Sequence, residues 1–338
     1  MTIHSTVSEI AAHFGRRAFT TSEAELAGVS SDRLQRASRA GLVQRLARGV
    51  YVMPDRNDVN AWHLTQGRAW RLQHDGVRAV IGTSAAAQRW GVPLMARPVG
   101  LPTIVTPTAS RVRTGVRNGI RFLREDLDPD DIRTSPPGDL VTSPVRTAID
   151  LIRHSRLAPR LAVATMSIAQ RLQWRHDHSL TSQGLRSQLA KPETRDALAA
   201  ASRASLSRAP NRGTSWLASG LHMCDPRLDS VLEALAWCDF IEAGLPMPTP
   251  QAWVQGASGQ RYCVDFLWEE HGVIGEADGA IKYSSPEEVL AERARQADLE
   301  AAGYRFVRWT WADAIGVRSY VARLTLTLNV GSPRFPAS

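Results

Sequence analysis

Apolar residues near the start of the chain recur at the spacing of short helices. The segment SEIAAHFGR has a helical period and is followed by two more segments of the same kind. Ser22 precedes Glu25 at the spacing of a capping box, so we expect Ser22 to be the N-cap of the second helix. Ser30 or Ser31 would begin the third helix, and Gly41 would end it.

Residues 42–54, LVQRLARGVYVMP, change from the helical period to alternation between apolar and polar residues. The alternation turns at Arg48–Gly49, as in a two-stranded hairpin. Helices followed by such a hairpin are typical of a winged helix-turn-helix, which places one helix in the DNA major groove. The alternative is a helical module whose arginines only solvate one face. The predicted nucleic-acid contacts are Arg33, Arg36, Arg39 and Arg48.

The remaining patterns divide the chain further. Residues 57–175 combine helical segments with strand-like runs such as LPTIVTP and GIRFLRE, which predicts a mixed α/β middle domain. Residues 176–222 are rich in Ser, Arg, Ala and Thr and are typical of a helical, polar connector. We therefore expect an α/β (α+β) multidomain protein, with domains at 1–56, 57–175 and 223–338 and a connector at 176–222.

The last domain begins with a helical apolar stripe that runs to Ile241 and carries Glu233 beside it. Two alternating runs, QRYCVDFLW and VIGEADG, follow and predict a β-hairpin. A four-residue turn places Asp265 opposite Glu276, and Asp278 projects from the same face as Glu276. Three carboxylates on one face would repel each other unless a cation lay between them.

Oxygen-rich ligand sets of this kind suit Mg²⁺ or Mn²⁺. The predicted metal ligands are Asp265, Glu276 and Asp278. Lys282, one of two lysines in a chain that otherwise uses arginine, follows soon after and would sit near a water nucleophile or a phosphate oxygen. The helical segment after it carries Arg295 and Gln296, which would face the phosphates.

The charge of the chain is unevenly distributed. The net charge is +2 over residues 1–60, +12 over residues 61–220 and −6 over residues 221–338. A basic middle favours attraction to phosphate, and an acidic end favours a metal site. The start of the chain lacks a signal-peptide pattern, and no apolar run approaches the length of a membrane span. We therefore expect a cytoplasmic protein without a membrane partner.

The N-terminal pattern resembles the AbiEi family of antitoxins. The matching residues are Gly41–Leu42 and Arg48–Gly49–Val50–Tyr51, which follow the short helices. The later segments SAAAQRWGVPL and TSPVRTAIDLIR resemble the region that follows the winged helix in actinobacterial relatives of these antitoxins. The resemblance implies DNA binding and transcriptional regulation.

The C-terminal order of elements resembles the PD-(D/E)XK superfamily, especially its branch of very-short-patch-repair-like endonucleases. By this resemblance Asp265 is the D, Glu276 the (D/E) and Lys282 a displaced K; Asp278 stands where a strict motif has lysine. The resemblance implies a restriction-endonuclease-like core in which Glu233 contacts a metal-bound water and Arg295 or Gln296 steadies the helix.

Two main hypotheses follow. The first is a metal-dependent endonuclease that hydrolyses phosphodiester bonds, with DNA as the favoured partner, and is targeted by the winged helix. Its predicted catalytic residues are Glu233, Asp265, Glu276, Asp278, Lys282 and Gln296. The alternative is an AbiEi-like regulator with a catalytically silent nuclease-like domain. A partner protein or a homodimer is compatible with either hypothesis.

Overall fold

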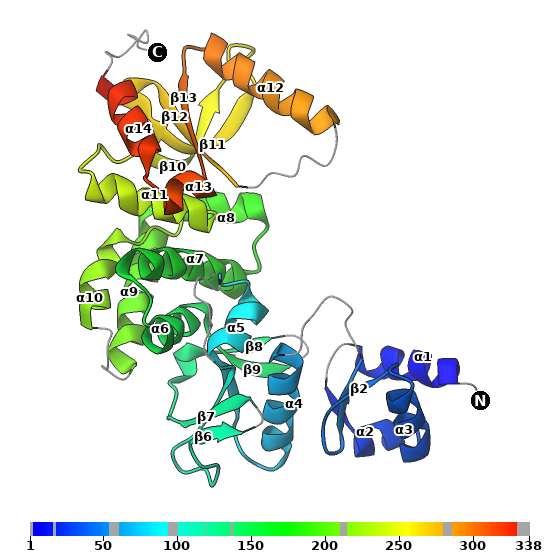
Figure 1. Ribbon diagram of the computed structural model, residues 1–338. Helices are drawn as coiled ribbons and strands as arrows, with labels where there is room; N and C mark the ends of the chain where they lie inside the picture. Colours follow the sequence, from blue (N-terminus) through cyan, green and yellow to red (C-terminus); the bar gives the residue numbers. More distant parts are fainter. Residues whose placement is uncertain are drawn as a thin grey trace. The chain divides into compact units, whose positions relative to one another are not determined.

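The computed structural model describes residues 3–15, 18–53, 61–93, 101–117, 119–135, 138–209, 215–279 and 286–329 (Figure 1). The chain divides into two compact units, which are described separately. The first combines Met1–Leu157 with Ser202–Ser215, and the second combines Ala158–Ala201 with Trp216–Ser338. None of the described helices has the length and apolarity needed to cross a membrane.

The first unit begins with three helices and a small sheet. The helices are α1 (Ile3–Phe14), α2 (Thr21–Leu26) and α3 (Ser31–Arg39), and the strands are β1 (Phe19–Thr20), β2 (Gln44–Ala47) and β3 (Val50–Val52) in the order β1-β3-β2. Buried apolar residues from every helix form the core. The hairpin turns at Arg48–Gly49, where Gly49 has a φ of 74°. The predicted winged-helix-like arrangement is therefore confirmed.

The predicted N-cap of the second helix was wrong by two residues. Thr20, not Ser22, caps α2: its hydroxyl accepts the Glu23 N–H, and the Glu23 carboxylate accepts the Thr20 N–H. Both pairs have capping-box spacing in the sequence. Tertiary structure selects Thr20, because this residue pairs with Val50 in the sheet and so holds the chain in the extended conformation that an N-cap needs.

The rest of the first unit is built on a six-stranded mixed sheet in the order β6-β7-β5-β4-β9-β8. The strands are β4 (Val80–Gly82), β5 (Thr103–Thr106), β6 (Gly115–Arg117), β7 (Ile120–Arg124), β8 (Ile132–Ser135) and β9 (Asp139–Thr142). Helices α4 (Ala61–His74), α5 (Thr83–Trp90) and α6 (Pro144–Ser155) and the 3₁₀ turn η1 (Pro129–Asp131) complete it. The mixed α/β character predicted for the middle of the chain is confirmed.

Arg146 is a buried arginine of the first unit that pairs with several acids. Arg146, on α6, is 1% exposed and forms ion pairs with Glu125, with Asp131 at 3.4 Å and with Asp150 at 3.1 Å. Two further arginines, Arg153 and Arg208, also pair with these acids. Some of the positive charge in the middle of the sequence is therefore neutralised inside the fold.

The second unit begins with helices. These are α7 (Pro159–His178), α8 (Ser182–Leu189), α9 (Pro192–Arg208, whose end belongs to the first unit), α10 (Ser215–Gly220) and α11 (Val231–Glu242), with the 3₁₀ turn η2 (Leu221–Met223). The segment predicted as a helical, polar connector contains α8, α9, α10 and the start of η2. Its predicted start at residue 176 lies within α7, because the helical period continues to His178 before Ser179 adopts a left-handed conformation with a φ of 51°.

A four-stranded sheet forms the other part of the second unit, in the order β10-β11-β12-β13. Strands β10 (Thr249–Gln255), β11 (Arg261–Trp268) and β12 (Val273–Asp278) are antiparallel, and β13 (Arg305–Thr310) runs parallel to β12. The remaining elements are η3 (Glu269–His271), α12 (Pro286–Ala301), α13 (Trp311–Ile315) and α14 (Ser319–Asn329). The predicted β11–β12 hairpin is confirmed, whereas β10 was not predicted.

Candidate functional site

Helix α3 presents arginines on the surface of the winged-helix domain. Leu34 and Ala37 are buried in the core, so the residues between them face outward. Arg36 and Arg39 are exposed, and so is Arg48 in the turn of the wing. Among the residues that the structure describes, none of these three forms an ion pair, so their guanidinium groups are available to phosphates.

Arg33 differs from the other arginines of α3. Its guanidinium donates to the Glu9 carboxylate at 2.8 Å, to the Thr6 hydroxyl at 3.2 Å and to the Gly28 carbonyl at 3.1 Å. These contacts connect α3 to α1 and to the end of α2. The predicted contact of Arg33 with nucleic acid stays a prediction and would require these donors to exchange partners.

The carboxylate of Glu233, in the second unit, is positioned at the N-terminus of helix α11. Ser230 is the N-cap of α11 and accepts the backbone N–H of Glu233. The Glu233 carboxylate turns back and accepts the backbone N–H of Asp229 at 2.9 Å. Glu233 is 4% exposed, so this charge lies in a poorly solvated environment.

The two carboxylates of the hairpin lie where its strands separate. The pairing of β11 with β12 ends at Phe266 and Gly275, and the same register places Asp265 across from Glu276, as predicted. Instead of a ladder bond, the Asp265 carboxylate accepts the backbone N–H of Ala277 at 2.9 Å. Asp265 is half-buried and Glu276 is 9% exposed.

Sequence reasoning missed Gln251 on β10. The register that pairs Pro250 with Phe266 places Gln251 across from Asp265. Its amide nitrogen donates to Glu233 at 2.9 Å and lies 3.5 Å from the Asp265 carboxylate. Its φ of 52° is uncommon for a residue other than glycine and is typical of functional positions. The alternation of TPQAWVQ was the signal that could have identified this strand.

The pKa of each of the three carboxylates is raised above its ordinary value, mainly by burial. Burial, and then the charge of Asp265, raise the pKa of Glu233 to about 8. The same two causes raise the pKa of Glu276 to about 7. The pKa of Asp265 is also raised, mainly by burial. This is the electrostatic signature expected of a cluster that lacks enough compensating positive charge.

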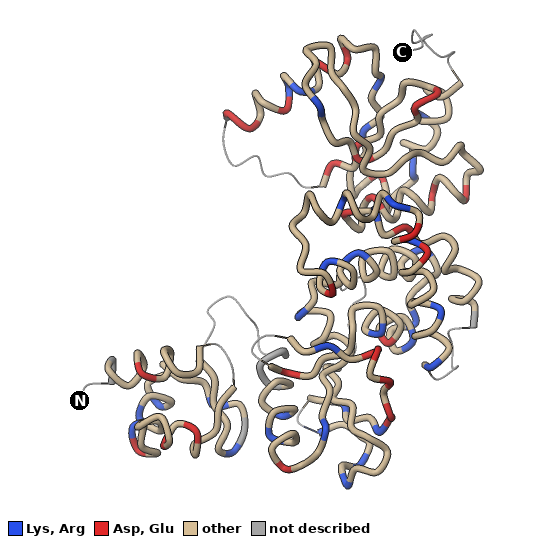
Figure 2. Tube along the Cα trace, turned by 180° about the vertical axis from the view of Figure 1, so that it is seen from behind, with Lys and Arg blue, Asp and Glu red and all other residues tan. Residues whose placement is uncertain are grey.

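Arginines compensate part of this charge. Arg295, on α12, donates to Glu276 at 2.7 Å and to Glu292 at 2.9 Å. Arg308, across from Glu276 on β13, pairs with Asp278 at 3.1 Å. Figure 2 shows that acidic and basic residues both lie along α12. Arg295 is therefore occupied by the carboxylates, and its predicted contact with phosphate would require it to exchange partners.

The Gln296 side chain pairs within its own helix. Gln296 donates its side-chain amide to Glu300 of the same helix at 2.7 Å, because the two residues are four positions apart on α12. The predicted contact of Gln296 with phosphate stays a prediction and would require this amide to exchange partners. Lys282 lies outside the described residues, so its predicted role stays a prediction.

The carboxylate oxygens of Asp265 and Glu276 are the type of ligand that Mg²⁺ prefers. In the part of the chain that the structure describes, no group of three or more His, Cys, Asp and Glu side chains is arranged to hold a metal ion. Mg²⁺ is commonly held by one or two carboxylates, with waters as its remaining ligands. Asp265 and Glu276 satisfy that requirement, whereas the Asp278 carboxylate is paired with Arg308.

A pocket of about 520 Å³ shares Gln251 with the carboxylate cluster. Trp253, which is 49% exposed, lines it, and the guanidinium of Arg261 lies 5.7 Å from the centre of the Trp253 ring. Arg186 of α8 lines the pocket as well. An exposed indole beside arginines is a surface on which a nucleic-acid base can stack.

Comparison with known proteins identifies the N-terminal domain. Residues 8–54 match the family described as "Transcriptional regulator, AbiEi antitoxin". Two curated proteins of Mycobacterium tuberculosis, Rv2248 of strain H37Rv and MT2308 of strain CDC 1551, are both described as uncharacterized and are each 28% identical over 170 residues. The alignment covers 50% of this chain, and the chain spans about half the length (54%) of these relatives.

A solved structure, Rv2827c from Mycobacterium tuberculosis, aligns with 75% of this chain and 89% of its own. The identity is 15% and the TM-score is 0.34. The family match thus places an AbiEi antitoxin-type domain at residues 8–54, and the nuclease resemblance of the last domain stays a prediction.

Proposed function

We propose that the protein is a DNA-binding transcriptional regulator of the antitoxin type. The observation that carries the proposal is the family match over residues 8–54, the segment in which α3 presents exposed Arg36 and Arg39. In a winged helix-turn-helix, the second helix of the motif enters the major groove. The exposed Arg48 of the wing would contact the phosphate backbone beside it.

The test is the salt dependence of duplex DNA binding, measured by fluorescence anisotropy. Replacing both Arg36 and Arg39 by Gln removes two phosphate contacts. The negative slope of the logarithm of the association constant against the logarithm of the salt concentration should therefore become shallower by about 2. The charge-matched control is Arg203→Gln on α9, which should leave the slope unchanged. An unchanged slope in the double variant would reject α3 as the DNA-binding helix.

Arg33 provides a second control. Because its guanidinium is held by Glu9, Thr6 and Gly28, Arg33→Gln should lower the melting temperature. The salt slope of the folded variant should remain that of the parent. A reduced slope without a loss of stability would show that Arg33 contacts DNA after all.

A protein partner belongs to the same proposal. Antitoxins act on toxins, so a protein encoded beside this one would be its expected partner. Co-expression of the two followed by size-exclusion chromatography tests this: a stable complex supports a toxin–antitoxin pair, and separate elution argues for a regulator that acts alone.

The carboxylate cluster favours a second candidate function, a metal-dependent nuclease. Glu233, Asp265 and Glu276 form a partly compensated cluster next to a pocket suited to a stacked base. Mg²⁺ or Mn²⁺ held by Asp265 and Glu276 would supply Lewis-acid polarisation of a phosphate and a more acidic water. Gln251 would orient the carboxylates, and Arg295 would shift toward Glu292 when Glu276 accepts the ion.

Two measurements test this candidate. In the first, Mg²⁺ or Mn²⁺ should raise the melting temperature of the parent but not that of an Asp265→Asn, Glu276→Gln double variant. In the second, labelled DNA and RNA should be cleaved by the parent alone. Stabilisation by metal without cleavage would indicate a silent nuclease-like domain. The absence of both stabilisation and cleavage would reject the metal site.

A further inference from the structure

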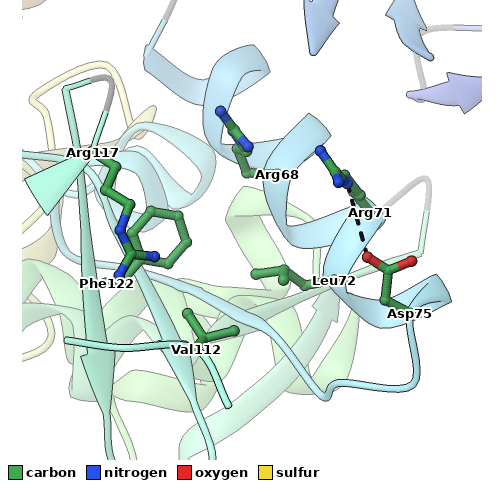
Figure 3. A pocket seen from close by; sticks show the side chains of 7 residues that line it. All are labelled: Arg68, Arg71, Leu72, Asp75, Val112, Arg117 and Phe122. Carbon is green, nitrogen blue, oxygen red and sulfur yellow. Dashed lines mark ion pairs between the residues drawn. The ribbon is translucent and has the colours of Figure 1, made fainter. Parts of the chain in front are cut away.

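A pocket in the first unit has no part in either proposed function. It lies between α4 and the β6–β7 region and has a volume of about 540 Å³, within the range of roughly 300–1,000 Å³ typical of small-molecule sites (Figure 3). Helix α4 supplies three residues at helical spacing, Arg68, Arg71 and Leu72, which therefore share one face, and Asp75 directly follows the helix. The lining residues are Arg68, Arg71, Leu72, Asp75, Val112, Arg117 and Phe122.

Positive charge exceeds negative charge in this pocket. Its lining contains three arginines and one aspartate. Arg71 and Asp75 form only an exposed pair at 3.8 Å, and Arg117 donates to the backbone carbonyl of Arg113. Within the described ranges, Arg68 has neither a hydrogen-bond nor an ion-pair partner. An anion would therefore find guanidinium donors that no carboxylate of the pocket neutralises.

The floor of the pocket is apolar. Phe122 belongs to the core of the six-stranded sheet, and Leu72 and Val112 pack against that core. The Arg117 guanidinium lies 5.4 Å from the centre of the Phe122 ring. An inorganic ion would leave this floor uncovered, whereas an organic anion would place its apolar body on the floor and its charge among the arginines.

Helix α4 also contacts the wing. Trp70 forms a buried cluster with Leu46, Val50 and Val52 of the small sheet. A Cβ on Gly67 would lie only 2.8 Å from the Cβ of Leu46, so the helix and the wing pack closely there. One helix thus lines the pocket with some residues and supports the DNA-binding domain with others.

We propose that this pocket binds a small organic anion and that its occupant changes DNA affinity through α4. The second part rests on the proposed regulator function, and the first does not. The binding test is calorimetric titration with naphthalene-1-sulfonate, compared with inorganic sulfate and neutral 1-naphthol. The organic anion should bind more tightly than either. Equal binding of sulfate or of naphthol would overturn the assignment.

Two variants change the affinity for naphthalene-1-sulfonate in opposite directions. Arg68→Gln removes a charged donor and should weaken binding by about tenfold or more. Asp75→Asn removes the acid of the lining and should strengthen binding, and its exposed position spares the fold. The charge-matched control Arg203→Gln should have no effect. Binding that is insensitive to both pocket variants would exclude this pocket.

The coupling to DNA is tested separately. Saturating naphthalene-1-sulfonate should shift the DNA affinity of the parent, and Arg68→Gln should need about tenfold more probe, or more, for the same shift. A bound probe with no shift would overturn the coupling and leave the site intact. If the protein binds no DNA at all, the proposed function fails while the calorimetric result still decides the pocket.

Discussion

Each unit contains a cluster of three acidic side chains, and the two clusters differ in how many arginines pair with them. In the first unit, Glu125, Asp131 and Asp150 surround Arg146, and Arg153 and Arg208 add further positive charge. The second unit has a cluster of Glu233, Asp265 and Glu276. Among the described residues, its ion pair is the one between Arg295 and Glu276.

The difference distinguishes a structural cluster from a candidate reactive one. Three arginines, Arg146, Arg153 and Arg208, pair with the three carboxylates of the first cluster, and the first two counteract the burial that raises the pKa of Asp150. In the second unit the pKa of Glu233 rises to about 8 and that of Glu276 to about 7, which shows that their negative charge is costly in the fold. Such a cluster gains stability from a proton or from a metal ion.

The largest effect is expected at the centre of the balanced cluster. Arg146→Ala would leave three acids without their shared partner, two of them fully buried, and should lower the free energy of unfolding by about 3–5 kcal/mol. Urea unfolding measures this loss. The exposed control Arg203→Ala should stay within about 0.5 kcal/mol of the parent, and an equally small loss for Arg146→Ala would contradict the comparison.

The unbalanced cluster should make stability depend on pH. Because the pKa of Glu233 is near 8 in the folded state and 4.5 is its ordinary value, the folded state holds a proton that the unfolded chain releases. The parent therefore loses stability as pH rises from about 4.5 to about 8, at up to about 1.4 kcal/mol per pH unit.

Glu233→Gln removes this titration. The stability of the variant relative to that of the parent should increase from pH 5 to pH 8 and then level off, which urea unfolding at several pH values measures. Parallel stability profiles for the two proteins would show that Glu233 is not destabilised by its surroundings.

Removing Arg295 tests the arginine that pairs with Glu276 in the unbalanced cluster. Arg295→Gln should cost roughly 1.5–3 kcal/mol at pH 8, where Glu276 is charged. The loss of stability should be smaller at pH 5, because this pH lies below the pKa of about 7 of Glu276. Arg293→Gln, an exposed change on the same helix, is the matched control. A cost independent of pH would point to packing of the arginine stem instead of charge.

The smallest effect is expected at the rim of the balanced cluster. Arg208 pairs with Asp131 at 2.8 Å but is 30% exposed, so Arg208→Gln should cost no more than about 1 kcal/mol while Arg146 remains. Thermal and urea unfolding would show this. A loss as large as that of Arg146→Ala would mean that Arg208 holds the cluster together.

Elements with strong local patterns could be predicted from the sequence. The winged-helix order and the β11–β12 hairpin with Asp265 across from Glu276 follow from periodicity and turn residues. The strand that carries Gln251 was missed, and so was the inward contact of Arg33 with Glu9. Both depend on partners that are distant in the sequence, and periodicity carries no information about them.

The sequence by itself therefore determined which residues alternate, the order of helices and hairpin in the winged-helix domain, and that acids would gather at one hairpin. Only the tertiary structure decided which charges meet a counterion. Arg146 is surrounded by acids from different elements, whereas Glu233 lies beside Asp265 and forms no ion pair with an arginine in the described part of the chain. The reason is that local backbone preferences act over a few residues, while burial and charge pairing depend on segments that folding brings together.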